Sequence, residues 1–509
     1  MPRTILGGEG VVRRIFPKTF YNPLSLMGAM VALLNLGLIV FLVILELVTK
    51  HPKPYTDVII FIILPTIVFC GLVLAAIGIV RERRRQKAGE LPEERLPIIN
   101  LNDPKHRTMV AVLGGGFVVL SLFYAFASYQ AYEYTESDTF CGQLCHSVMG
   151  PESTAHAFSP HAEIQCVACH VGSGARYFFL SKLDGSHQLY ALVFNKYHRP
   201  IPTPISNLRP SQDTCQTCHA PKQRVTDRIV WRPHFLSDAK NTEWIISLLL
   251  KMGSGSTETT APPNLHWHYT VAKEINYVAA DAKRTVIPWI KVTSLDGKER
   301  IYRSTGSKMT DSELESAEKR VMDCIDCHNR IGHFFRPPAP VLNMYMQVKR
   351  IDPSLQEIKK IAVQALEGTY ASKEAGRDGI RKMIMDFYQS TYPEVASSRK
   401  ADIEKAIAEI QDIYRRNYDP VMKVSWKDFA DNAGHMYSVG CFRCHDGNHV
   451  SDDGRVLSKD CSTCHLLISP AVDRAKGRAV FTLAKYPHPV DIGDAYKEMN
   501  CSACHGGTT

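Results

Sequence analysis

Apolar residues are concentrated in the first 130 positions of this 509-residue chain, and a polar sequence follows. Three apolar runs are each long enough to cross a bilayer, which takes about 20 helical residues. They cover roughly Leu24–Val48, Val58–Val80 and Met109–Ser128. The first run is too long for a signal-peptide core and lacks a small-residue cleavage site, so we expect it to be retained. The pattern predicts a three-helix transmembrane anchor over residues 1–135.

Basic residues around the apolar runs predict the orientation of this anchor. By the positive-inside rule, the flanks rich in Lys and Arg stay in the cytoplasm. The N-terminus and the loop after the second run are therefore cytoplasmic, and an odd number of spans puts the polar remainder on the other side. The basic residues are Arg3, Arg13, Arg14 and Lys18 before the first run and Arg81, Arg83, Arg84, Arg85 and Lys87 after the second, against only Lys50 and Lys53 between them.

The polar remainder contains few stretches with a clear period. Alternation over Glu274–Tyr302 around Leu295-Asp-Gly297 predicts a β-hairpin. Thr310 and Glu313 form a capping box that predicts a helix ending at Cys324. Between 346 and 420 two apolar stripes of helical period predict a helical hairpin, with helices from Asp352 to Gly368 and from about Ser398 to Arg416.

Fourteen of the fifteen cysteines form seven pairs, and a histidine directly follows each pair. At this spacing two thiols reach the two vinyl groups of one porphyrin while the next side chain presents an imidazole to the iron, so the motif predicts c-type haem attachment. One match could be a zinc or redox site, but seven occurrences favour haem, and a disulfide framework needs no such histidines. The motifs are Cys141, Cys145 and His146, which is one residue wider than the rest, then Cys166, Cys169 and His170; Cys215, Cys218 and His219; Cys324, Cys327 and His328; Cys441, Cys444 and His445; Cys461, Cys464 and His465; and Cys501, Cys504 and His505.

Six-coordinate haem irons need a second axial ligand from elsewhere in the chain. Histidines outside the motifs are numerous enough to supply one for each of six irons. We predict the ligands from their position near a motif or in an aromatic setting, with His156, His187, His198 and His234 as further candidates. The predicted distal ligands are His161, His266, His268, His333, His435, His449 and His488.

Composition supports a core built from cofactors. Three motifs fall between Cys441 and His505, a segment too short to bury a conventional apolar core. The formal charge of +9 belongs to the chain without haem, and the propionates of seven haems would reduce it. The polar part has no Lys/Arg stripe of the kind that binds nucleic acid, so we predict no nucleic-acid partner.

The stretch from residue 109 to about 225 resembles the NapC/NirT family of membrane-anchored quinol dehydrogenases. An apolar run leads directly into Cys141–Met149, and Ser159-Pro-His161, Lys182-Leu-Asp184-Gly185 and the Pro200–Pro210 stretch follow between the motifs. The number and layout of the motifs are most similar to inner-membrane heptahaem cytochromes of metal-reducing bacteria.

The resemblance implies that quinol is oxidised beside the first haem, with a methionine just past the motif as axial ligand. Met149 is the matching residue, but it lies one position further from the motif than in the family, so Met149 or His146 could bind this iron. We favour Met149, because thioether ligation raises the haem potential. Quinol oxidation also releases protons, and Glu152, Lys182 and Asp184 are the candidates to accept them.

The sequence therefore predicts a mainly α protein with little regular structure, in which a three-helix membrane anchor carries a periplasmic multihaem cytochrome c domain with a small β-hairpin insert. The predicted parts are the anchor (1–135), a module with haems 1–3 (136–225), an insert with haem 4 (226–345), a helical spacer (346–420) and a module with haems 5–7 (421–509).

The predicted function is a quinol:cytochrome c oxidoreductase of the bacterial inner (cytoplasmic) membrane. It would take electrons from menaquinol through seven c-type haems to periplasmic multihaem cytochromes, in respiration with extracellular or metal acceptors. Its partners are membrane lipid, the quinol pool and these cytochromes, and a homo-oligomer is compatible with the pattern. The alternatives are a terminal reductase of a nitrogen or sulfur oxyanion, which the lack of a C-x-x-C-K motif disfavours, and a passive haem scaffold.

Overall fold

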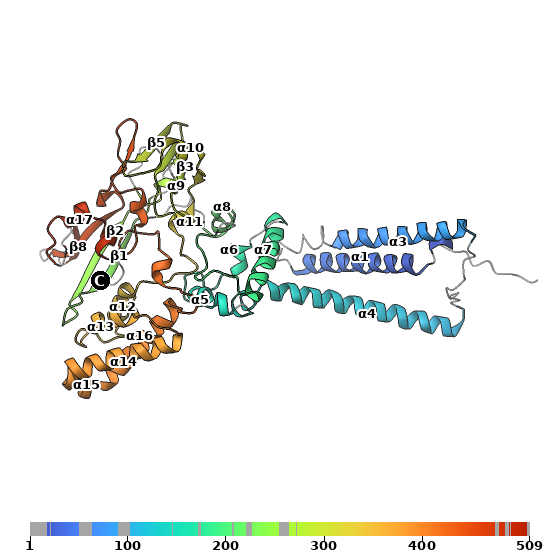
Figure 1. Cartoon of the computed structure of the whole chain (residues 1–509), viewed down its shortest axis with the longest axis horizontal. Coiled ribbons are helices and arrows are strands. Elements are labelled where there is room, and N and C mark those ends of the chain that lie inside the picture. The colour runs from blue at the N-terminus through green and yellow to red at the C-terminus, as the bar shows by residue number, and fades with distance from the viewer. Residues whose placement is uncertain are drawn as a thin grey trace, which may run out of the picture. The chain divides into compact units, whose positions relative to one another are not determined.

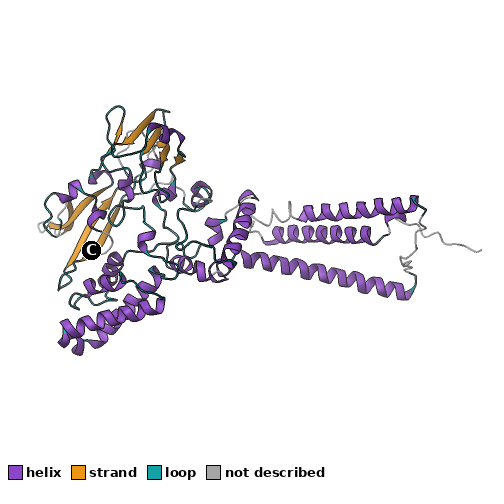
Figure 2. Ribbon diagram, in the orientation of Figure 1, coloured by secondary structure: helices purple, strands orange, loops and turns teal. Residues whose placement is uncertain are grey.

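The computed structural model describes residues 18–20, 22–49, 64–89, 102–144, 146–171, 175–205, 208–219, 226–253, 264–270, 272–473, 478–483, 488 and 490–505. The chain forms two compact units. The first comprises Met1–Ser137 with Val171–Leu183, and the second comprises Asp138–His170 with Asp184–Thr509. Helices predominate, and the strands of the described residues all lie between Arg228 and Leu483 (Figures 1 and 2).

The first unit contains three long helices, α1 (Pro23–Thr49), α3 (Leu64–Lys87) and α4 (Pro104–Thr135). Helices α1 and α3 lie side by side (Figure 1). Glycines allow this close approach, since a Cβ on Gly28 would lie 2.5 Å from the main-chain nitrogen of Ala75, and one on Gly71 would lie 2.8 Å from the carbonyl oxygen of Gly28. The Ser25 hydroxyl donates a hydrogen bond to the Ala75 carbonyl across the same seam (2.9 Å). Small residues at the crossing are typical of helix pairs in membranes.

Two helical segments of the first unit, Pro23–Ile44 and Leu64–Lys87, are long and apolar enough to cross a membrane. Large apolar side chains on their outer faces are exposed, as Leu33 and Phe69 illustrate. The third predicted span lies within α4, which also exposes Val119 and Phe123. A membrane crossing by α4 remains a prediction, and the start of the second predicted span lies outside the described residues.

The largest apolar core of the second unit belongs to a helical region. It consists of α12 (Pro338–Gln347), α13 (Ile358–Leu366), α14 (Lys373–Thr391), α15 (Pro393–Ser398) and α16 (Lys400–Asn417). The predicted helical hairpin is wrong, because α14 packs between the two predicted helices. Its inner face is a buried stripe of Ile380, Ile384 and Tyr388, which are spaced four residues apart.

The strands of the described residues form two antiparallel sheets. The predicted hairpin is present as β4 (Trp289–Ser294) and β5 (Glu299–Ser304), joined by a turn in which Gly297 has a φ of +81°. It belongs, however, to a five-stranded sheet of order β6-β3-β4-β5-β7, and a four-stranded sheet has the order β1-β2-β8-β9. The prediction of one small hairpin was therefore too low in strand content. The remaining strands are β1 (Arg228–Phe235), β2 (Glu243–Leu250), β3 (Ala272–Val278), β6 (Arg320–Val321), β7 (His449–Ser451), β8 (His465–Asp473) and β9 (Arg478–Leu483).

Strands from the C-terminal part complete both sheets. Strand β7 pairs with β5, and β8, which begins at the motif residue His465, pairs with β2. The capping box at Thr310 and Glu313 starts α10 (Asp311–Ser316) as predicted. The helix ends at Ser316 instead of Cys324, because β6 follows and pairs with β3. The strands next to motifs four and five thus belong to one sheet, and motif six begins a strand of the other.

Candidate haem sites

The first motif lies against helix α5 (His146–Ala157). Cys141 is part of a π-helical turn, η3 (Phe140–Leu144), in which a Cβ on Gly142 would lie 2.5 Å from the Ser153 hydroxyl oxygen. Cys145 and the side chain of His146 lie outside the described residues. Met149 is half-buried on α5, one helical turn before Glu152, so these two candidates lie on one side of the helix.

Each of the other six motif histidines faces a second histidine from a different part of the chain. Two imidazoles bound to one metal through nitrogens at about 2.0–2.1 Å would have ring centroids roughly 6 Å apart. The observed separations match this requirement. The pairs are His161 with His219 (5.9 Å), His333 with His170 (6.0 Å), His266 with His328 (6.5 Å), His268 with His445 (5.7 Å), His435 with His465 (6.1 Å) and His488 with His505 (5.9 Å).

Hydrogen bonds orient four of the six partner histidines. In His266, His268 and His333 the ring Nδ1 lies within hydrogen-bond distance of a main-chain carbonyl, which can only accept, so Nδ1 carries the proton and Nε2 keeps its lone pair. This is the arrangement in which a histidine binds a metal through Nε2. The Nδ1 of His488 contacts both the carbonyl oxygen and the N–H of Val490. The contacts join His266 to Met252 (2.9 Å), His268 to Leu265 (3.3 Å), His333 to Glu152 (2.9 Å) and His488 to Val490 (2.7 Å).

Burial favours the neutral form of three of the partner histidines. It lowers the pKa of His268 and of His333 to about 4, and it also lowers the pKa of His435. A neutral imidazole is the form that binds a metal. The residues present therefore fit haem, which would supply an iron that cycles between two oxidation states.

The predicted distal ligand His449 has a different environment. Its Nδ1 lies 2.8 Å from the Asp446 carboxylate and its Nε2 lies 2.7 Å from the Ile287 carbonyl oxygen, and the side chain is buried. Both ring nitrogens are thus used within the protein, and the structure does not support His449 as an iron ligand. His156 lies near His333, at 5.8 Å, but its Nε2 contacts the Ile164 carbonyl oxygen at 2.9 Å.

Cysteines of consecutive motifs are neighbours. The pKa of Cys166 is raised first by a hydrogen bond with Cys141. Burial first, and then also a cysteine of the adjacent motif, raises the pKa of Cys169, Cys324, Cys327, Cys464 and Cys501. Thioether bonds to haem would abolish these titrations. The interactions nevertheless show that the thiol groups lie close to one another. Among the described cysteines, every such interaction between motifs joins motifs that are consecutive in sequence. The neighbours are Cys141 and Cys166, Cys169 and Cys215, Cys215 and Cys324, Cys327 and Cys441, Cys441 and Cys464, and Cys461 and Cys501.

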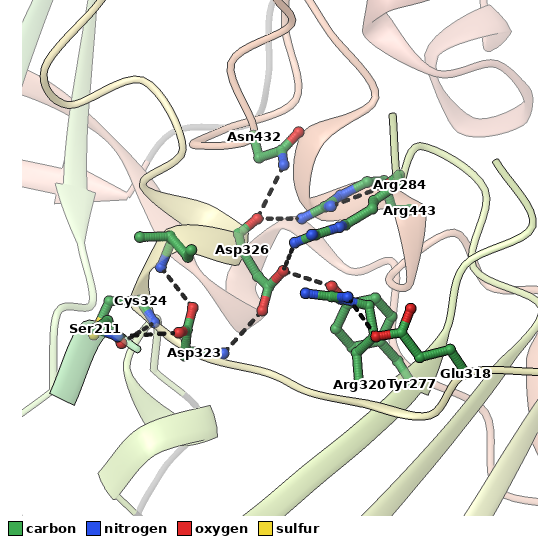
Figure 3. Close-up of polar contacts among 11 residues, drawn as sticks. Ser211, Tyr277, Arg284, Glu318, Arg320, Asp323, Cys324, Asp326, Asn432 and Arg443 are labelled. Carbon is green, nitrogen blue, oxygen red and sulfur yellow. Dashed lines mark hydrogen bonds and ion pairs between the residues drawn. The ribbon is translucent and has the colours of Figure 1, made fainter. Parts of the chain in front are cut away.

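A buried polar network fastens the fourth motif to the fifth (Figure 3). Asp326, between the two cysteines of motif four, accepts hydrogen bonds from the Tyr277 hydroxyl (2.5 Å) and from Arg284 (3.5 Å). Its main-chain carbonyl accepts from Arg443 (2.7 Å), which lies between the two cysteines of motif five, and from Asn432 (3.0 Å). Burial, followed by the Asp326 charge, raises the pKa of Tyr277, so its hydroxyl remains a donor. This network sets the spacing of the two motifs.

Helix α8 (Ser211–Thr214) links the third motif to the fourth in the same region (Figure 3). The Ser211 main-chain N–H donates to the Asp323 carboxylate, and its hydroxyl accepts from the N–H of Cys324, both at 3.4 Å. The Cys215 of motif three follows directly after α8. Motifs three, four and five are thus joined through direct hydrogen bonds.

We expect Asp326→Ala to destabilise the region around motifs four and five by about 3–5 kcal/mol, the usual cost of removing one partner of a buried ion pair. The substitution leaves the Arg284 guanidinium and the Tyr277 hydroxyl without their acceptor. Denaturant titration of the holoprotein, followed by the loss of low-spin haem absorbance, measures the effect. Asp296→Ala, which breaks the exposed ion pair with Lys298, is the control and should leave the unfolding midpoint unchanged. Equal midpoints for both variants would contradict the assigned role.

Glu152 has the most perturbed carboxyl group among the quinol-site candidates. Burial, partly offset by a main-chain hydrogen bond, raises its pKa to about 7, with Asp419 raising it further and Arg330 lowering it. Its main-chain carbonyl accepts from His333 (2.9 Å), the partner of motif histidine His170. A carboxyl group that titrates near neutral pH can accept a proton at physiological pH.

Lys182 and Asp184 lie on helix α7 (Ala175–Val193), two residues apart and so on different faces of the helix. Lys182 forms an ion pair with Glu136 (2.7 Å) within the first unit. Glu136 is a buried residue directly after α4, and sequence reasoning missed it, although its position behind the aromatic end of an apolar run was a usable signal. Asp184 is half-buried and belongs to the second unit.

Seven cysteine pairs are each followed by a histidine, and six of these histidines face a second histidine. This arrangement defines a c-type cytochrome, here with helices suited to a membrane. More particularly, the chain belongs to the NapC/NirT cytochrome c family: the family's N-terminal region matches residues 103–201. The chain is also 40% identical over 488 residues, 95% of each chain, to the cytochrome c-type protein ImcH of Geobacter sulfurreducens. No solved structure matches the chain significantly. The family predicted from the sequence is confirmed.

Proposed function

We propose that the chain oxidises a quinol, menaquinol in particular, and carries the electrons through seven c-type haems in sequence order to a soluble multihaem cytochrome. In this proposal it is a quinol:cytochrome c oxidoreductase of the bacterial inner membrane, with the haem-bearing unit in the periplasm. The observation that carries the proposal is that cysteines of consecutive motifs are neighbours, from Cys141 to Cys501. Haems attached at such sites would lie close together, as electron transfer requires.

The histidine pairs support six-coordinate iron at motifs two to seven. An iron with two imidazole ligands has no open position for a substrate, so these sites suit electron transfer better than the reduction of an oxyanion. The proposed distal ligands are His161, His266, His268, His333, His435 and His488, the partners of the motif histidines. For the first haem we propose Met149, with His146 as the alternative ligand.

Proton release accompanies quinol oxidation, and the proposal assigns it to side chains of α5 and α7. Glu152 is the principal candidate base, because its pKa of about 7 lets it exchange a proton at neutral pH. Lys182 and Asp184 are proposed to bind the quinol oxygens or relay protons. The name of the relative in Geobacter sulfurreducens is compatible with this function but specifies no donor or acceptor.

The test uses the full-length holoprotein in detergent. Its intact mass should equal the 57.1 kDa chain plus seven haems, and a menaquinol analogue should reduce all of them. Met149→Ala and Lys182→Ala should lose reduction by quinol while dithionite still reduces every haem, whereas the exposed-site control Lys298→Ala should behave as wild type. A high-spin iron that binds nitrite or CO would favour a terminal reductase, and quinol-driven reduction unaffected by either variant would contradict the proposed entry point.

A further inference from the structure

A cavity of about 620 Å³ lies along the last turns of α3, at the end of the helix that carries its basic residues. Its described lining comes from α3 and from the Ala88 that follows it. Apolar side chains, Val73 and Val80 among them, line the part nearer the middle of the helix, and Arg81 and Arg84 line the end. A ligand that matches this lining is apolar over most of its length and negatively charged at one end.

The cavity lies on the face of α3 that points away from α1. Gly71 and Gly78 are buried where α3 packs on α1. An α-helix turns by about 100° per residue, so Val73, Val80 and Arg84 lie on the opposite side of α3. The side chains of Val73 and Val80 are exposed there, by 40% and 48%. On a helix that crosses a membrane, this face would meet lipid.

The distance from Val73 to Arg84 matches the depth of one leaflet of a bilayer. The two residues are 11 positions apart in the sequence, which corresponds to a rise of roughly 16 Å at 1.5 Å per residue. Half of the hydrocarbon core of a bilayer is about 15 Å thick. A phospholipid whose phosphate lies at Arg84 would therefore place an acyl chain beside Val80 and Val73.

The arginines of the cavity supply positive charge that the chain does not neutralise. Arg81 and Arg84 are exposed. Among the residues that the structure describes, neither forms an ion pair, and Glu82 accepts a hydrogen bond from Gln86 (3.5 Å). The positive-inside rule explains basic residues at this end of the helix, but it does not require them to line an apolar cavity. Because a guanidinium binds phosphate through paired hydrogen bonds, the charged end of the cavity suits a phosphate group.

We propose that this cavity binds one anionic phospholipid, with its phosphate at Arg81 and Arg84 and an acyl chain along Val73, Ile77 and Val80. Basic pockets beside membrane helices bind anionic headgroups in this way. A free phosphate would leave the apolar lining uncovered, and a neutral quinol would bring no charge to the arginines. The inference goes beyond quinol oxidation and does not depend on it, since the cavity belongs to the first unit and involves no haem.

The experiment measures lipid binding to the holoprotein in detergent by native mass spectrometry, with phosphatidylglycerol and phosphatidylethanolamine of the same acyl chains. Wild type should bind the anionic lipid more tightly. Arg81→Gln with Arg84→Gln should weaken that binding by about 30-fold, as expected for two basic residues near a membrane surface. The matched control, Arg83→Gln with Lys87→Gln, removes two charges from the same end of α3 but from residues that do not line the cavity, and should bind as wild type.

Ile77→Trp tests the apolar part, because the larger side chain fills the cavity and should weaken binding of phosphatidylglycerol while both arginines remain. Equal affinities of wild type for the two lipids would overturn the proposal. An equal loss in the control variant would show general attraction to basic residues and would overturn it too. Displacement of the lipid by inorganic phosphate or by a menaquinol analogue would assign the cavity to that ligand instead.

Discussion

Removing the fourth haem by Cys324→Ala with Cys327→Ala is expected to confine quinol-driven reduction to the three haems that precede it. Six motifs remain in this variant, and dithionite should reduce all six haems. The physical reason is the single-file order of the motifs. Motif three neighbours motif four through Cys215 and Cys324, and motif four neighbours motif five through Cys327 and Cys441. With the fourth porphyrin absent, an electron would have to cross the space that it occupied.

The matched control removes the last haem by Cys501→Ala with Cys504→Ala. This variant also retains six motifs, but no haem lies beyond the gap, so quinol should reduce all six. Stopped-flow absorbance at the haem α-band measures both variants against wild type. The contradicting result is full reduction by quinol of the variant without haem four, at a rate close to that of the control. That result would mean that electrons bypass motif four and that the path between the haems is branched.

Replacing Glu152 by Gln is expected to slow haem reduction by quinol about 100-fold at pH 8, the lower end of what a general base contributes. The pKa of Glu152 is raised to about 7, mainly by burial. The ionised carboxylate is the form that accepts a proton, and it predominates above that pH. In wild type the rate should therefore rise as the pH increases from 6 to 8, with its midpoint near 7, and in Glu152→Gln this rise should disappear.

Glu163→Gln is the control for this experiment, since Glu163 is an exposed carboxylate nearby in the sequence. Its rate should follow the wild-type pH profile. Reduction by dithionite separates loss of quinol oxidation from loss of haem. A Glu152→Gln protein that keeps the wild-type pH profile would remove Glu152 from the proton path and leave Lys182 and Asp184 as the candidates.

The candidate haem-attachment cysteines can be located from the sequence because the motif is local. A pair of thiols and the following histidine fall within five or six residues, so spacing alone identifies them. The partner histidines were only partly predictable, since pairing depends on the fold. His333 follows motif four in sequence but faces His170 of motif two, whereas His449, equally close to a motif, is used in hydrogen bonds with Asp446 and the Ile287 carbonyl.

The helices could be predicted where apolar residues recur regularly over a long segment. The first apolar run and the stripe of α16 predicted their helices to within two residues. Helix α14 was missed because charged residues, Gly376 and Gly379 occupy its first half and weaken the helical signal. Strand β8 was missed because its pairing with β2 joins residues more than 200 positions apart. Polar networks such as that of Asp326 and Arg443 give no periodic signal at all, although a charged residue between two motif cysteines was a clue.

The positions of the irons in the holoprotein, determined by cryo-electron microscopy, test the single-file order most directly. The account predicts seven haems in one row that follows the sequence from Cys141 to Cys504. It further predicts that each iron of motifs two to seven lies between the histidines paired here, such as His268 and His445. A row that skips or exchanges motifs, or an iron bound by a different histidine pair, would contradict it.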